Sequence, residues 1–94
     1  MIKIFDLAEI VVAKYKKAKQ LSMAQEECAE LIVAISHFKR GRRNAEAEIR
    51  EEMADVAFMI YQLMVITKMT SAQMAEIIVK KYERLEKREE VKNA

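Results

Sequence analysis

The sequence contains few of the residues that interrupt helices or cross-link chains. Among its 94 residues there is no proline, and Gly41 is the single glycine. Because proline breaks helix interiors and glycine weakens them, this composition favours long uninterrupted helices, and we expect an all-α protein. One cysteine, Cys28, excludes a disulfide within the chain and suits a reducing compartment. A chain of this length fits one domain, residues 1–94.

Strong charge imbalance and long apolar runs are also missing. The formal net charge is only +2, so the overall field gives no reason to expect a nucleic-acid partner. The longest apolar run, residues 56–67, is interrupted by Gln62 and is shorter than the roughly 20 residues that span a bilayer. The first residues, MIKIFD, lack the basic start and apolar centre of a signal peptide. We therefore expect a soluble cytoplasmic protein with no membrane partner.

Apolar residues are abundant for so short a chain. They make up 52% of the sequence, and charged residues make up a further 34%. A monomer of this size can bury only about 60–65% of its unfolded surface. We therefore expect a homo-oligomer, a dimer or a tetramer, whose interface covers the remaining apolar surface.

Capping patterns predict four helices. Asp6–Glu9, Ser22–Gln25 and Thr70–Gln73 each resemble a capping box and mark three helix starts. Asn44 is the expected cap of the remaining helix, and Gly41 the expected left-handed residue that ends the helix before it. The predicted architecture is an antiparallel bundle of about four helices. Its parts are a first helix and turn over 1–21, a helix pair over 22–68 and a final helix over 70–90.

One acidic pattern occurs twice. The copies are EECAELIVAI at residues 26–35 and EEMADVAFMI at residues 51–60. Helix positions three apart share a face, so Glu27 lies beside Glu30, and Glu52 lies beside Asp55. Both pairs stand in or next to an apolar stripe, where unpaired buried carboxylates cost several kcal/mol each. These acids therefore need a common positively charged partner.

The spacing about Gly41 places the two acid pairs at the same height. Glu30 precedes Gly41 by as many positions as Glu52 follows it, and the same equality holds for Glu27 and Asp55. In an antiparallel helix pair, Glu30 is then level with Glu52, and Glu27 with Asp55. Oxygen ligands without neighbouring histidine or cysteine favour Mg²⁺, with Mn²⁺ as a substitute.

The two motifs together, E-E-x-x-E at positions 26–30 and E-x-x-D at positions 52–55, resemble the MazG-like all-α nucleoside triphosphate pyrophosphohydrolase superfamily. The resemblance extends from about residue 22 to residue 88. It implies that the four acids hold Mg²⁺ ions, which bind the phosphate chain of a nucleotide. Water would attack the α–β phosphate junction to give nucleoside monophosphate and pyrophosphate. The resemblance makes Glu26 and Glu27 the candidate catalytic residues, with Glu26 orienting or deprotonating the water.

The final helix also resembles that of the superfamily. Its sequence KKYERLEKR implies that Lys81, and Arg84 one turn later, contact the substrate phosphates. Lys81 additionally lies on the apolar stripe of this helix, together with Met74, Ile77, Ile78 and Leu85. The base pocket is expected to involve the first helix and a neighbouring subunit.

Other functions fit parts of the pattern. Within the same chemistry the substrate could be phosphoribosyl-ATP, or dUTP, although dUTPases usually have longer chains. A non-catalytic helical dimerisation module is the alternative from another class, and it predicts no effect of metal on stability. Away from the acids we expect Cys28 to be a small buried residue, His37 a partly exposed residue at a helix end, and residues 39–43 a solvated basic turn.

Overall fold

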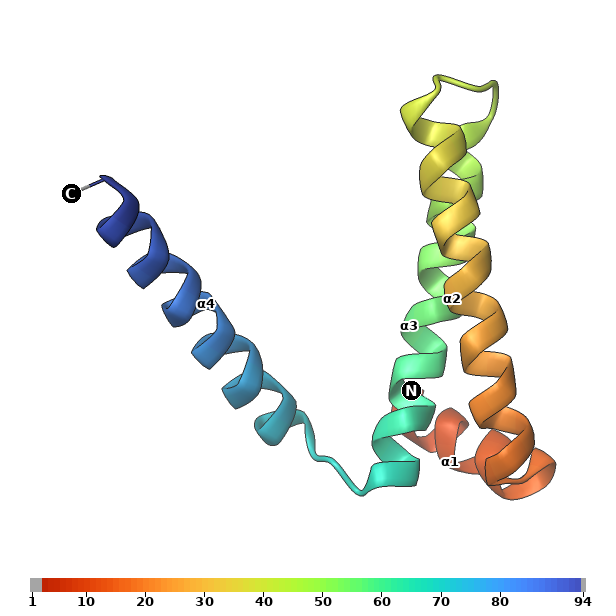
Figure 1. Ribbon diagram of the computed structural model, residues 1–94. Coiled ribbons are helices and arrows are strands. Elements are labelled where there is room, and N and C mark those ends of the chain that lie inside the picture. Colours follow the sequence, from red (N-terminus) through yellow and green to blue (C-terminus); the bar gives the residue numbers. More distant parts are fainter. Residues whose placement is uncertain (1–2, 94) are drawn as a thin grey trace.

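The computed structural model describes residues 3–93 of the protein, and this range contains four α-helices and no strand. The predicted all-α class is therefore confirmed. The helices are α1, Ile4–Tyr15; α2, Lys17–Lys39; α3, Ala45–Thr67; and α4, Ser71–Asn93. In Figure 1, α2 and α3 stand side by side, α1 lies across their base, and α4 extends away.

An antiparallel hairpin of α2 and α3 is the centre of the fold (Figure 1). Gly41 ends α2 with a φ of +69°, the left-handed conformation predicted for it. Its N–H donates to the Phe38 carbonyl at 3.0 Å, and the Arg42 N–H donates to the His37 carbonyl at 3.1 Å. These two bonds satisfy carbonyls at the helix end. Asn44 precedes α3 as predicted, but its own φ is 62° and its side chain makes no capping bond.

The break between the first two helices lies earlier than the sequence patterns predict. Asp6 lies inside the first turn of α1, and Ser22 lies inside α2, so neither residue is a helix cap. The chain turns instead at Lys16, whose φ is 75°. The residues from 17 to 21 favour helices and extend α2 backwards, and this extension buries the Gln20 side chain against α3.

Small and flexible side chains fill the contact between the helices. The buried apolar residues are Ala8, Ala24, Ala34, Ala45, Met59 and Met64. Between α2 and α3, Gln20 Nε2 donates a 2.6 Å hydrogen bond to Gln62 Oε1, and Gln62 is only 1% exposed. Phe5 packs edge-on against Tyr61 with ring centroids 4.9 Å apart, which attaches α1 to α3. The register of the hairpin is thus fixed by a buried amide pair as well as by apolar contacts.

A short elbow, residues 68–70, separates α4 from the other helices. Lys68 ends α3 with a φ of 58°, its N–H donates to Val65, and the Met69 N–H donates to Met64. Directly afterwards, the Thr70 N–H donates to the Gln73 side chain at 2.9 Å, and the Gln73 N–H donates to Thr70 Oγ1 at 3.1 Å. The predicted Thr70 capping box is confirmed. Caps on both sides thus fix the connection.

The predicted four-helix bundle is wrong for the single chain. Packing joins α1, α2 and α3 to one another, whereas α4 packs on none of them within residues 3–93. A bend of 111° separates α3 from α4. No single helix in the described range is long and apolar enough to cross a membrane. Only α3 and α4 counted together across this bend meet that criterion of length and composition.

Much apolar surface remains uncovered in the single chain. The accessible area is 7820 Å², whereas a compact monomer of this mass exposes about 5,600 Å². Its radius of gyration is 16.7 Å, against roughly 12 Å for a compact domain of this length. Large apolar side chains on α2 and α3 are exposed, including Ile35, Phe38, Met53 and Ile60. Exposed apolar side chains therefore contribute to the excess area.

Gly41 and Lys68 both adopt the left-handed conformation, and we expect substitutions at these two positions to change the free energy of unfolding in opposite directions. Lys68→Gly should raise the free energy of unfolding by about 0.5–1 kcal/mol, because glycine adopts this conformation without a Cβ clash. Gly41→Ala should lower it by about 1 kcal/mol through backbone strain alone, since no atom lies within 4 Å of the added Cβ. Urea denaturation at fixed protein concentration measures both changes. If both substitutions changed the free energy of unfolding in the same direction, the assigned backbone strain at these two positions would be wrong.

Candidate active site

Three carboxylates converge between α2 and α3. One carboxylate oxygen each from Glu27, Glu52 and Asp55 lies within 4.8 Å of the other two. Glu27 comes from α2, while Glu52 and Asp55 occupy adjacent turns of one face of α3. We call these three residues the acid cluster. Its position follows from the hairpin register, which brings the two copies of the acidic pattern to the same height.

The acid cluster lacks a counter-charge. Glu27 Oε2 and Glu52 Oε2 are buried and have no hydrogen-bond partner. Burial raises the pKa of both side chains above the ordinary 4.5, and repulsion from Glu30 and Asp55 raises it further. The ion pairs found among the described residues involve other acids, namely Glu46, Glu48 and Glu76. Two orphaned buried oxygens among mutually repelling carboxylates fit a bound cation, and all-oxygen donors suit Mg²⁺ or Mn²⁺.

The other residues predicted for the site occupy different positions. Glu30 lies close enough to raise the pKa of Glu27 and Glu52, but it falls outside the group that converges within 4.8 Å. Glu26 is exposed, and its side chain points about 100° around α2 from that of Glu27. Lys81 and Arg84 are exposed on α4, which does not touch the hairpin. The chain therefore assembles the carboxylates but not the predicted phosphate contacts.

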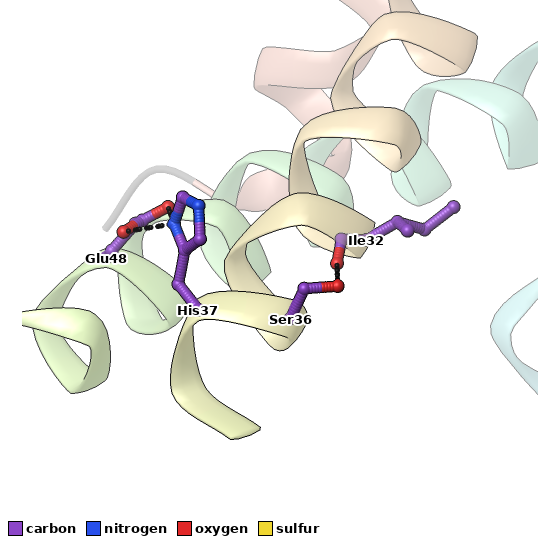
Figure 2. A network of polar contacts seen from close by, with 4 residues as sticks. All are labelled: Ile32, Ser36, His37 and Glu48. Atoms are coloured by element: carbon purple, nitrogen blue, oxygen red, sulfur yellow. Dashed lines mark hydrogen bonds and ion pairs between the residues drawn. The ribbon is translucent and has the colours of Figure 1, made fainter. Parts of the chain in front are cut away.

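A histidine–glutamate pair closes the tip of the hairpin, as Figure 2 shows. His37 Nδ1, in the last turn of α2, lies 2.9 Å and 3.1 Å from the two oxygens of Glu48 in α3. Because a carboxylate only accepts, Nδ1 carries the proton. Glu48 precedes Glu52 by one turn and contributes to the raised pKa of Glu52. Sequence reasoning missed this partner, because Glu48 lies farther from Gly41 along the chain than His37 does and equal spacing does not pair them.

The sequence predicted a buried Cys28 and a solvated basic turn at residues 39–43, and only the second prediction agrees with the structure. Cys28 is exposed and free, so the expectation of a small buried residue is wrong. Its side chain is rotated about 100° around α2 from that of Glu27 and lines a surface groove with Leu63 of α3. The basic residues of 39–43 are exposed, as expected for a solvated turn.

The fold and the acid cluster define a class: small helical proteins in which two antiparallel helices present carboxylates suited to a divalent cation. A family model described as the MazG nucleotide pyrophosphohydrolase domain matches residues 16–90. The chain belongs to this family, as the two acidic motifs indicated. Comparisons with curated proteins and with solved structures gave no match.

The raised pKa values generate a prediction for the metal-free protein. A folded-state pKa above the ordinary 4.5 means that the folded state holds more protons, so stability falls as pH rises from 4.5 towards neutrality. Below pH 4.5 these carboxyls are protonated in both states and the penalty disappears. Glu52→Gln should therefore be more stable than the parent at neutral pH in a chelator and show a shallower pH dependence.

Thermal unfolding across this pH range, at one protein concentration, measures the effect. Glu46→Gln is the matched control, because its exposed pair with Arg50 is worth at most about 0.5 kcal/mol. A Glu52→Gln profile parallel to that of the parent would show that the cluster carries no repulsive strain.

Proposed function

We propose that this protein is a Mg²⁺-dependent nucleotide pyrophosphohydrolase that cleaves the α–β phosphate bond of nucleoside triphosphates. The products are a nucleoside monophosphate and pyrophosphate. One observation carries the proposal: carboxylates from both acidic motifs converge, and two of their buried oxygens have no partner. Membership of the MazG nucleotide pyrophosphohydrolase domain family supplies the reaction class.

The metal ligands proposed are Glu27, Glu52 and Asp55, with Glu30 beside them. A bound Mg²⁺ or Mn²⁺ would supply charge neutralisation for the phosphate chain and lower the pKa of a water molecule. The chain's own contribution is to keep the ligands pre-assembled, because the hairpin holds them together against their mutual repulsion. Without a cation a polyanionic substrate would be repelled from this surface.

Two further roles are proposed from the resemblance to the superfamily. Glu26 is exposed beside Glu27, and no ion pair among the described residues occupies it. We assign Glu26 to orient the attacking water or accept its proton. Lys81 and Arg84 are assigned to phosphate oxygens that the metal does not hold.

The proposed active form is a homo-oligomer, a dimer or a tetramer. The chain exposes roughly 2,200 Å² more than a compact monomer of its mass would. In an obligate homodimer each partner covers about 1,000–2,500 Å². The excess is therefore of the size that one homodimer interface covers.

Three alternatives can be tested by experiment. Phosphoribosyl-ATP would undergo the same cleavage in the same cluster, and dUTP is a further substrate of this class. A non-catalytic dimerisation module would use the exposed apolar stripes alone and would gain no stability from metal. The cluster's unpaired buried oxygens favour the enzyme.

Metal binding should be visible as stabilisation. Mg²⁺ at a hundred times its Kd should raise the free energy of unfolding by about 2.7 kcal/mol. Asp55→Asn should lose this gain and lower kcat/KM for the preferred nucleotide at least about 100-fold. Glu46→Gln serves again as the control and should keep both properties.

The assay is pyrophosphate release from canonical, deoxy and damaged nucleoside triphosphates and from phosphoribosyl-ATP, with Mg²⁺ or Mn²⁺. If no compound yields pyrophosphate, or if Asp55→Asn turns over as fast as the parent, the proposed function is wrong. Release from phosphoribosyl-ATP alone would select that alternative.

Glu26→Gln separates the chemical step from metal binding. It should lower kcat by about 10²–10⁴-fold, because general bases typically contribute this much. Since Glu26 lies outside the acid cluster, stabilisation by Mg²⁺ should remain. Unchanged turnover would exclude Glu26 from the reaction.

A further inference from the structure

A further carboxylate stands beside the acids proposed as metal ligands without joining them. Glu48 precedes Glu52 by one helical turn, so the two side chains share a face of α3. Helical side chains lean towards the helix N-terminus, which places the carboxylate of Glu52 over the turn that carries Glu48. The negative charge of Glu48 adds to the raised pKa of Glu52. Glu48 nevertheless falls outside the group of acids that converges within 4.8 Å.

The His37 side chain accounts for this separation. Figure 2 shows its ring facing Glu48, with Nδ1 at 2.9 Å and 3.1 Å from the two carboxylate oxygens. Both oxygens therefore face one donor on α2. Among the described residues, only this contact and the Gln20–Gln62 pair join side chains of two helices by hydrogen bonds. The position of the Glu48 carboxylate is thus set from the opposite helix.

No other cation on α3 can replace His37 as the partner of Glu48. The residues one turn away on that helix are uncharged or acidic, namely Asn44, Ala45, Glu51 and Glu52. If His37 is removed, a metal ion in the acid cluster becomes the cation that attracts Glu48. Cβ atoms four positions apart on a helix are separated by about 6 Å. Paired side chains bridge this distance elsewhere in the chain, as Glu46 and Arg50 do at 2.8 Å.

An added carboxylate would change what the acid cluster binds. Mg²⁺ is usually held by roughly one or two carboxylates together with waters and substrate phosphates, whereas Ca²⁺ accepts about six to eight oxygens at longer distances. A further carboxylate therefore raises the affinity for a cation, and raises it most for Ca²⁺. It also occupies a metal position that water or a phosphate oxygen needs for the reaction.

We propose that His37 is a positioning residue that ties Glu48 to the tip of the hairpin and thereby keeps it out of the metal site. This role rests on the metal site of the function proposed above, and His37 itself touches neither metal nor substrate. Stability is a weak explanation for the pair, because the side chains of His37 and Glu48 are 22% and 40% exposed. Ion pairs so open to water contribute little to stability.

Metal affinity measured without substrate tests this role. Binding of Mn²⁺, followed by loss of the free-ion electron paramagnetic resonance signal, should be about tenfold tighter in His37→Ala than in the parent. In competition with Mn²⁺, Ca²⁺ should gain more affinity than Mg²⁺. The double variant His37→Ala, Glu48→Gln should return to within about twofold of the parent affinities. Circular dichroism checks that each variant keeps its helix content.

His37→Asn is the matched control, because its side-chain amide can still donate to Glu48 but carries no charge. Its metal affinities should stay within about twofold of the parent values. A gain equal to that of His37→Ala would mean that the lost ring, rather than the released carboxylate, changes metal binding, and would overturn the positioning role. An unchanged or weaker Mn²⁺ affinity in His37→Ala, or a gain that persists in the double variant, would overturn it too.

Failure of this role can be told apart from failure of the proposed function. A parent chain that binds no Mn²⁺ would defeat the metal site and the proposed function with it. If the parent binds Mn²⁺ and His37→Ala gains nothing, only the role of His37 is wrong. With the preferred nucleotide, His37→Ala should also lower kcat/KM about tenfold, and the added Glu48→Gln should restore it.

Discussion

Repulsion among carboxylates at a helix–helix contact is the constraint that governs this protein. Apolar packing between α2 and α3 brings Glu27 against Glu52 and Asp55, and burial leaves two oxygens without a partner. The cost appears as raised pKa values for Glu27 and Glu52. A contact that only held the helices together would be more stable with neutral side chains there. The proposed cation would offset this repulsion, and the rest of the hairpin holds the carboxylates in place.

Two polar contacts on either side of the acid cluster supply much of that holding. The Gln20–Gln62 pair lies towards the base of the hairpin and is almost completely buried. Sliding one helix past the other would leave both amides unpaired, at about 1–3 kcal/mol each. His37 and Glu48 join the helices near the tip, in the last turn of α2 and the first turn of α3. Helix dipoles favour a positive charge at the first of these places and a negative charge at the second.

Much of the fold and of the candidate site could be predicted, because local patterns determine them. The duplicated acidic motif, Gly41 and the Thr70 box each act over a short stretch of chain, and together they place the carboxylates at one height. Turns made by residues with no turn preference could not be predicted. Lys16 and Lys68 adopt left-handed conformations that lysine rarely takes, so the end of α1 and the direction of α4 were missed. Cys28 was missed because one helix position, about 100°, decides between core and surface.

The elbow at residues 68–70 has a consequence for the rate of assembly. All its hydrogen bonds join residues between Met64 and Met74, so it can form without any contact to a distant part of the chain. Because the elbow already determines the direction of α4, this helix would lose little conformational entropy on packing against another chain. In the proposed homo-oligomer, encounter between chains would then be limited by diffusion and orientation rather than by slow rearrangement, and the apolar stripes would stay uncovered only briefly.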